Sequence, residues 1–330
     1  MAVAFRRLAL AAAALAFVVV VIGAYVRLED AGLGCPDWPG CYGQLIGVPT
    51  QDHELAQARQ AFDRRVDVGR ARTEMLHRYL AGTLGLLILA IAIIAWRARV
   101  RLGQSPFLAA ALVMLVAFQA TLGMWTVTML LKPVIVTLHL LGGMATLGLL
   151  TWLALRQLPL RRPEGGSAGR LRPWAAVALV VLMVQIALGG WVSTNYAALA
   201  CVDFPTCGGE WLPDMDFRDA FHIVRELGMT AAGTPLSQEA LAAIQWTHRV
   251  GALITFLIAG AVALAALGAR GFRVHGGVLL ALLLVQIGLG IANVLLRLPL
   301  AMAVAHNAGA ALLLVALVVL NFTFSPKPLR

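Results

Sequence analysis

The sequence predicts an all-α integral membrane protein with eight transmembrane helices, arranged as two tandem four-helix bundles. Three observations predict this architecture. Of the 330 residues, 60% are hydrophobic and only 13% are charged, which is too apolar for a soluble domain. Eight apolar segments are long enough to cross the hydrocarbon core of a membrane, which takes about 20 helical residues. The second half of the sequence also repeats the first half along nearly its whole length.

The eight apolar segments are each expected to form one membrane-spanning helix. The first is expected to be a span and not a cleaved signal peptide, because its apolar run is too long and no clear cleavage site follows. A linker at 161–173 is expected to separate a first domain, 1–160, from a second domain, 174–330. The predicted spans are residues 8–27, 76–96, 106–128, 134–155, 174–195, 246–268, 274–296 and 301–322.

The charged residues divide unequally between the two sides of the membrane. The termini and the connections after residues 96, 155 and 268 carry 14 of the 26 Lys and Arg residues, with a single acid, Glu164. The other side has the remaining 12 basic residues and 15 acids. The positive-inside rule therefore predicts a multi-pass cell-membrane protein with both termini in the cytoplasm. The net charge of +10 needs no nucleic acid to explain it.

Two long loops, 28–75 and 196–245, are predicted to lie on the outer face of the membrane. They are too long to be simple connections between helices. Each loop includes a charged, potentially amphipathic stretch, at 52–68 and at 214–228. These two stretches are expected to form short helices on the membrane surface.

Each outer loop also has two cysteines at the same spacing, Cys35 with Cys41 and Cys201 with Cys207. In an oxidising compartment each pair is expected to form a disulfide that closes a short loop. The separation differs from that of a CxxC redox motif, so we favour a role in holding the loop over a pocket. Electron or thiol exchange is the alternative.

The internal repeat has an offset of about 166 residues, and the segments Ile22 to Val26 and Leu188 to Val192 illustrate it. Because an even number of spans separates the copies, both have the same orientation in the membrane. We therefore expect a pseudo-two-fold axis along the membrane normal. Repeated polar and small residues are expected to give close helix packing with an interhelical hydrogen bond. They are Gln119, Gly123, Gln185, Gly189, Gln286 and Gly290.

Four histidines recur within the repeat, two in each half. His77 and His248 are predicted in the first turn of a membrane helix, and His139 and His306 one to two turns deeper. Histidine within a span is uncommon and usually functional, although it can simply bond a neighbouring helix. Zinc usually takes three or four protein ligands, whereas two facing imidazoles suit the axial positions of a haem iron. The sequence therefore predicts two haems, one in each half.

The two halves differ beside the first histidine of each pair. Glu74 precedes His77 by three residues and lies on the same helical face, whereas the second half has Gln245 at this position. Glu74 is therefore a candidate proton acceptor or cation stabiliser, and a helix-end charge is the alternative. Arg78 and Arg249 follow the histidines and are candidates for binding haem propionates, or else are charges at the membrane interface.

At these residues the sequence resembles the haem A synthase family. The resemblance rests on Val26-Arg27, on the run from Gly32 to Gly43 that includes Cys35-Pro36-Asp37-Trp38-Pro39-Gly40-Cys41, and on Glu74-x-x-His77-Arg78. The other three histidines and the duplication of four spans also match, so that the resemblance covers essentially the full chain. Residues 28–31 depart from the Thr/Ser/Gly-rich run that is usual at this position in the family. None of the expected haem ligands lies among these four residues.

The resemblance implies oxidation of the C8 methyl group of haem O to a formyl group through successive hydroxylations, which gives haem A for terminal oxidases. Haem O synthase, the farnesyl-transferring enzyme, is the expected partner that delivers haem O, and the electron partner is unknown. Because haem O has a long isoprenoid tail, we expect a lipid-open groove beside the spans 76–96 and 134–155.

The resemblance also implies a role for each site residue. His77 and His139 would frame the substrate haem O, and Glu74 would assist its oxidation. His248 and His306 would ligate the iron of a haem b cofactor. The expected propionate contacts are Arg27, Arg78 and Arg249.

Two other classes of protein remain open. A transmembrane electron-transfer cytochrome also uses bis-histidine haems, but it normally has one histidine pair near each membrane face. A transporter made of duplicated bundles would explain the repeat, but it would not explain why histidines recur at these positions.

Overall fold

The computed structural model describes residues 2–102, 105–158 and 166–325. Within these ranges, eight helices are long and apolar enough to span a membrane, which confirms the predicted all-helical membrane protein with eight spans. These helices are α1 (Ala2–Leu28), α3 (Val68–Arg97), α5 (Phe107–Thr128), α6 (Pro133–Leu155), α7 (Gly166–Thr194), α9 (Gln238–Gly268), α10 (Arg273–Leu295) and α11 (Leu300–Phe324). Residues 166–173 of the expected linker thus belong to α7, and residues 161–165 lie outside the described ranges.

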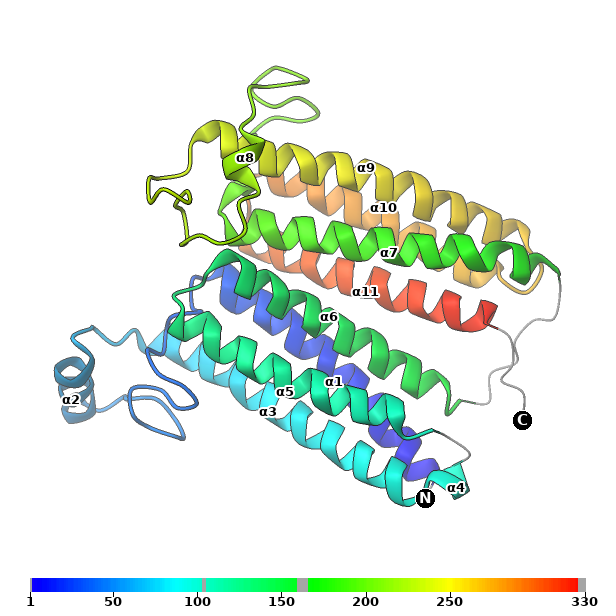
Figure 1. Ribbon diagram of the computed structural model, residues 1–330, viewed down its shortest axis with the longest axis horizontal. Coiled ribbons are helices and arrows are strands. Elements are labelled where there is room, and N and C mark those ends of the chain that lie inside the picture. The colour runs from blue at the N-terminus through cyan, green and yellow to red at the C-terminus, as the bar shows by residue number, and fades with distance from the viewer. Residues whose placement is uncertain (1, 103–104, 159–165, 326–330) are drawn as a thin grey trace.

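The long helices form two groups of four (Figure 1). In the first group, α1 and α5 each pack against both α3 and α6, so that α3 and α6 stand at opposite corners. In the second group, α7 and α10 each pack against both α9 and α11, which again occupy opposite corners. The two groups meet where α1 and α6 contact α11 and where α6 contacts α7.

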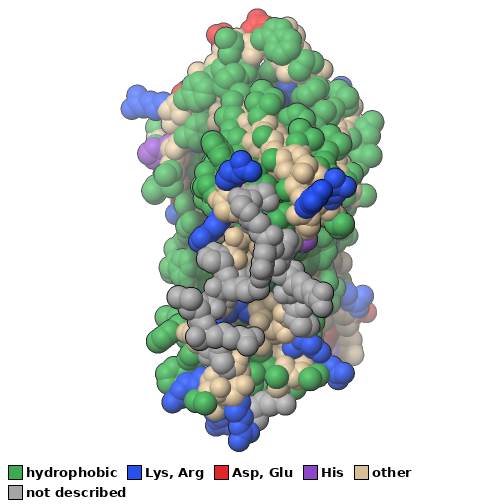
Figure 2. Space-filling view, turned by 90° about the vertical axis from the view of Figure 1, so that its right-hand side faces the viewer, with side chains coloured by type: hydrophobic (Ala, Val, Ile, Leu, Met, Phe, Trp, Pro, Cys, Tyr) green, Lys and Arg blue, Asp and Glu red, His purple; other side chains and the backbone are tan. Residues whose placement is uncertain are grey.

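Both long loops lie at one end of the helices, and α1 begins and α11 ends at the opposite end (Figure 1). Figure 2 looks onto this opposite end and shows Lys and Arg side chains spread around it. The described basic residues near this end are Arg6, Arg7, Arg97, Arg99, Arg101, Arg156, Arg170, Arg172, Arg270 and Arg273. Arg161, Arg162, Glu164, Lys327 and Arg330, which the charge analysis also assigned to this side, lie outside the described ranges.

Helices α3 and α9 begin earlier than hydropathy suggests. The Asp67 carboxylate caps α3 and the Ser237 hydroxyl caps α9, each by accepting a hydrogen bond from a backbone amide three residues on. His77 and His248 therefore lie more than two turns inside their helices, and the prediction that they lie in the first turn was wrong. The capping residue sets where a helix starts, whereas the apolar run marks only where the chain becomes hydrophobic.

The two surface stretches of the outer loops behave differently. The first forms the three-turn helix α2 (Asp52–Phe62), but the second forms only the single turn α8 (Phe217–Ala220), preceded by the short 3-10 helix η1 (Ala197–Leu199). The second loop is held by Arg225, which is buried and donates hydrogen bonds to Asn195 Oδ1 at 2.7 Å and to the Ala220 carbonyl at 3.2 Å. This contact draws residues after α8 against the end of α7. The remaining short helix of the described chain is α4 (Arg99–Leu102).

Candidate functional site

The four histidines lie as two pairs in separate helix groups. His77 on α3 and His139 on α6 belong to the first group, and His248 on α9 and His306 on α11 belong to the second group. The two helices that carry each pair stand at opposite corners of their group. The structure thus brings together the residues that the sequence analysis paired.

Each imidazole packs against a glycine on the preceding membrane-spanning helix. A Cβ atom built on this glycine would lie only 3.0 to 3.3 Å from the Cε1 atom of the histidine. The four contacts are Gly23 with His77, Gly123 with His139, Gly189 with His248 and Gly290 with His306. Any larger residue would displace the ring, because packed interiors do not absorb extra volume without strain. The glycines therefore reserve the space that each imidazole occupies.

The predicted interhelical hydrogen bonds of the glutamines are confirmed. Each glutamine donates its side-chain amide to the backbone carbonyl of a histidine on the next membrane-spanning helix. The distances are 2.7 Å for Gln119 with His139, 3.0 Å for Gln185 with His248, and 3.0 Å for Gln286 with His306. The sequence pattern showed the glutamines and glycines but not that histidines are their partners.

The side chains around each histidine pair fit a haem better than a metal ion with several protein ligands. No group of three or more His, Cys, Asp and Glu side chains suited to a metal occurs in the part of the chain that the structure describes. Within the helix groups, the Nδ1 atoms of His77, His139 and His306 are buried without a hydrogen-bond partner. Two imidazoles on opposite helices match the axial ligands of a haem, whose porphyrin supplies the other four ligands.

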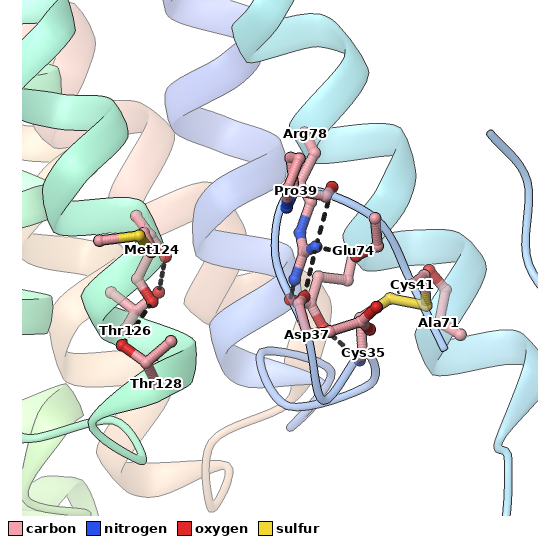
Figure 3. A network of polar contacts seen from close by, with 12 residues as sticks. Cys35, Asp37, Pro39, Cys41, Ala71, Glu74, Arg78, Met124, Thr126 and Thr128 are labelled. Atoms are coloured by element: carbon pink, nitrogen blue, oxygen red, sulfur yellow. Dashed lines mark hydrogen bonds and ion pairs between the residues drawn. A yellow bond between two sulfur atoms is a disulfide. The ribbon is translucent and has the colours of Figure 1, made fainter. Parts of the chain in front are cut away.

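Glu74 is buried beneath the first disulfide loop (Figure 3), with 4% of the residue exposed. Its Oε1 atom accepts a hydrogen bond from Arg78 Nη2 at 2.5 Å, and its Oε2 atom accepts one from the Cys35 amide at 2.8 Å. Glu74 lies in the second turn of α3, beyond the first turn in which a carboxylate interacts appreciably with the helix dipole. Gln245 on α9 is equally buried, but its Oε1 atom has no hydrogen-bond partner.

Arg78 and Arg249 direct their guanidinium groups at backbone carbonyls of the disulfide loops. Arg78 Nη1 donates to the carbonyl of Asp37 at 2.9 Å and also to the carbonyl of Gly40. Figure 3 shows Arg78 beside Asp37. Arg249 donates to the carbonyls of Thr206 at 2.7 Å and Cys201 at 2.9 Å. The several donors of an arginine suit the converging carbonyls of a tight loop, so these residues tie each loop to its helix.

Arg27, the third arginine singled out by the sequence, lies where the two helix groups meet. Its Nη2 atom donates to the Ser193 carbonyl at 2.7 Å, and its Nη1 atom donates to the Tyr196 hydroxyl at 3.1 Å. The guanidinium also lies over the Tyr196 ring, 4.3 Å from its centroid, and pairs with Asp30 at 3.4 Å. Arg27 therefore links the end of α1 to the end of α7.

Both predicted disulfides, Cys35–Cys41 and Cys201–Cys207, are confirmed. An aspartate folds the chain inside each of them. Asp203 accepts hydrogen bonds from the amides of Gly208 at 2.7 Å and Gly209 at 2.9 Å, and from the Thr206 hydroxyl at 2.5 Å. Asp37 accepts amide hydrogen bonds in the same way in the first loop. The repeat and the preference of aspartate for turns are the signals that could have identified both residues.

The second disulfide loop is expected to loosen in acid. The Thr206 hydroxyl and the amides of Gly209 and Gly208 hold the pKa of Asp203 well below its ordinary value of 3.8. Because the pKa of the folded state is the lower one, the carboxylate stabilises the loop fully above about pH 5, and this stabilisation is lost as the pH falls toward the depressed value. We expect Asp203→Asn to speed hydrogen exchange of the Gly208 and Gly209 amides at pH 7.

Asp214→Asn is the matched control for this measurement, because Asp214 is an exposed carboxylate of the same outer loop. At every pH, the exchange rates of the Gly208 and Gly209 amides in Asp214→Asn should equal those in the wild type. Equal exchange rates in wild type and in Asp203→Asn would show that the aspartate does not hold the loop.

A pocket of about 360 Å³ opens between the first outer loop and α3. Its walls combine the loop after the first disulfide with one face of α3, and most of the lining side chains are apolar. The lining residues are Gly47, Val48, Thr50, Arg72, Met75, Leu76 and Tyr79. The pocket thus borders one of the two helices beside which a groove was expected, and no residue of α6 lines it.

Comparison with known proteins gives matches over almost the whole chain. A family model described as COX15-CtaA, cytochrome oxidase assembly protein, matches residues 6–318. A heme A synthase of Shewanella oneidensis is 46% identical over 307 residues, which cover 92% of each chain. A heme A synthase of Rhizorhabdus wittichii is 29% identical, covering 92% of this chain and 89% of the relative. One of Bacillus licheniformis is 29% identical, with coverages of 87% and 85%.

Proposed function

We propose that the two helix groups of this protein have different tasks. The premise is that the chain belongs to the COX15-CtaA family of cytochrome oxidase assembly proteins and is a haem A synthase. The first group binds haem O and oxidises its C8 methyl group to a formyl group through successive hydroxylations. The second group holds haem b. The observation that carries this division is the ionisable, buried Glu74 beside His77, where the second group has Gln245.

In the first group, His77 and His139 hold the substrate between α3 and α6. Glu74 lies one turn before His77 on the same face of α3, where it can hold or move a proton at a carboxylate oxygen. Arg78 and the Cys35 amide fix the position of this carboxylate. The same contacts seal the outer end of the group with the first disulfide loop and so limit the access of water.

In the second group, His248 and His306 are the ligands of haem b. When bound, haem b supplies a one-electron carrier. Gln245 keeps the shape of a glutamate without its charge, so this site offers no carboxylate for proton transfer. Its role is therefore support for the first site, and Arg249 holds the loop above it as Arg78 does in the first group. The guanidinium groups of Arg27, Arg78 and Arg249 lie at the loop end, where haem propionates would be placed.

The two groups are related by a pseudo-two-fold axis along the membrane normal, with both termini in the cytoplasm and the haem sites toward the outer face. The equivalent helix order in the two groups and the sequence offset of about 166 residues support the axis. The basic residues at the end away from the loops support the orientation. The first domain is then residues 1–160, and the second is residues 166–330, because residues 166–173 belong to α7.

The pocket beside α3 is suited to the isoprenoid tail of haem O. Met75, Leu76 and Val48 give it an apolar lining, and it opens next to the α3 turn that carries His77. An opening toward lipid would let the substrate arrive from haem O synthase, the farnesyl-transferring enzyme, without crossing water. The electron partner of the reaction is outside this proposal.

The test is turnover of haem O. Membranes of cells that make haem O, with and without this protein, are extracted, and the haems are separated by chromatography. We expect haem A or its hydroxylated intermediate only when the protein is present. If haem O stays untouched while the purified protein contains haem b alone, the protein is an electron-transfer cytochrome.

A further inference from the structure

The two disulfide loops carry the same exposed apolar turn, which directly follows the isolated β-bridge of each loop. In the first loop, Leu45 is 73% exposed and Ile46 is 85% exposed. In the second loop, Trp211 is 72% exposed and Leu212 is 70% exposed. The two pairs are 166 residues apart, which is the offset of the internal repeat. Adjacent large apolar side chains that recur in an exposed turn indicate a contact with something apolar outside the chain.

The exposed side chains of α3 mark where this helix enters the hydrocarbon core. Its exposed large apolar side chains begin at Leu76 and end at Trp96. Two exposed arginines, Arg72 and Arg97, lie just outside this stretch. Trp96 follows Leu76 by 20 residues, or about 30 Å of helix, which is the thickness of the hydrocarbon core. Leu76 therefore lies at the outer boundary of the hydrocarbon.

The first apolar turn is tied to α3 at this boundary. The amide of Gly47, the residue after Ile46, donates a hydrogen bond to the Tyr79 hydroxyl at 2.7 Å. Tyr79 lies about one turn inward of Leu76, and side chains on a helix lean toward its N-terminus, so the hydroxyl returns to the level of Leu76. Gly47 also lines the pocket beside α3 together with Leu76 and Tyr79. The turn therefore lies at the level where α3 meets lipid.

The second apolar turn has the same relation to α9. Trp246 Nε1 on α9 donates a hydrogen bond to the Trp211 carbonyl at 3.0 Å. Trp246 precedes Gly268, the last residue of α9, by 22 residues, or about 33 Å of helix, so it also lies near the outer boundary of the hydrocarbon. In Figure 1, part of the first loop lies below α3 and part of the second loop lies above α9, on the two sides farthest from the contact between the helix groups.

We propose that the two apolar turns insert into the outer leaflet of the membrane and anchor the disulfide loops to its acyl chains. Lipid surrounds the spans on every side, which explains why the same turn occurs on two opposite sides of the molecule. Arg78 and Arg249 hold the loops from the helix side, and the turns hold them from the lipid side. Because Gly47 lines the pocket beside α3, the first turn also places the mouth of this pocket in the leaflet. The inference does not depend on the haem sites.

Nitroxide labels on the full chain in phosphatidylcholine bilayers test the insertion. All four cysteines of the sequence form disulfides, so Ile46→Cys and Leu212→Cys each provide a single thiol for the label. The matched controls are Gln60→Cys and Ala232→Cys, at exposed positions of the same two loops. At both turns the label should collide readily with oxygen, which dissolves in lipid. Its collisions with a water-soluble nickel chelate should be several-fold rarer than those of the control labels.

Two results would overturn the proposal. If the chelate reaches the label at either turn as often as it reaches the control in the same loop, the turn lies in water. If oxygen and the chelate are both excluded from a turn, protein covers it, for example a second copy of the chain.

Trp211 allows a second measurement that needs no added cysteine. The fluorescence of Trp211 is the emission that the wild type has and Trp211→Phe lacks. This difference should be several-fold weaker in bilayers of phosphatidylcholine brominated near the top of its acyl chains than in the unbrominated lipid, because bromine quenches tryptophan on contact. An equal difference in the two lipids would contradict the insertion of the second turn.

Discussion

Replacement of Glu74 by glutamine is expected to stop haem A formation while haem b stays in place. Glutamine has the shape of glutamate and can still accept the Cys35 amide hydrogen bond, so the loop should keep its position. It cannot take up a proton or carry a charge, and loss of a positioned acid or base typically lowers a rate by about 10²- to 10⁴-fold. The measurement is the amount of haem A formed per haem b in membranes that contain haem O.

The repeat supplies a matched control for this variant. Gln245→Glu places a carboxylate at the equivalent buried position of the second group, and it should leave haem O oxidation in the first group close to the wild-type rate. A Glu74→Gln protein that still forms haem A at the wild-type rate would mean that Glu74 only fastens the disulfide loop to α3.

Removal of the Arg78 side chain is expected to have the largest effect on stability. Only 12% of this side chain and 5% of that of Glu74 are exposed, so the two form a buried ion pair. Arg78→Ala leaves the Glu74 carboxylate buried without its partner, which should lower the free energy of unfolding by about 3–5 kcal/mol. Thermal unfolding of the purified protein in detergent measures this change.

Arg249→Ala is the control for the ion pair. Arg249 binds loop carbonyls as Arg78 does, but the residue at the position of Glu74 is the uncharged Gln245, so its removal strands no buried charge. We expect a clearly smaller loss of stability. Equal losses in the two variants would show that the carbonyl contacts, and not the ion pair, account for the effect of Arg78.

The eight spans and the disulfides could be predicted from sequence because their signals are local or repeated. Hydropathy identifies a span from its own residues, and the repeat doubles the weight of each cysteine and histidine. The starts of α3 and α9 could not be predicted in this way, since Asp67 and Ser237 cap the helices within polar sequence that hydropathy assigns to the loops. The buried Arg225 donates to the carbonyls of Asp219 and Ala220 at the end of α8, a contact that a local pattern does not show.

The site was predictable as a set of residues but not as a set of contacts. The sequence marked Arg78 and Arg249 by their position after a histidine, but their partners are carbonyls of a loop some forty residues away in the chain. The glutamine and glycine pattern was visible as well. Its meaning depends on knowing which helix lies beside which, because the donor of Gln185 meets His248 only once α7 packs against α9.

The central claim, that the first helix group oxidises haem O and the second holds haem b, is tested most directly by the haem content of two variants. His77→Ala and His248→Ala are purified from cells that make haem O, and their extracted haems are separated by chromatography. We expect His77→Ala to retain haem b without forming haem A, and His248→Ala to lose haem b. Retention of haem b in His248→Ala together with its loss in His77→Ala would contradict the division between the groups.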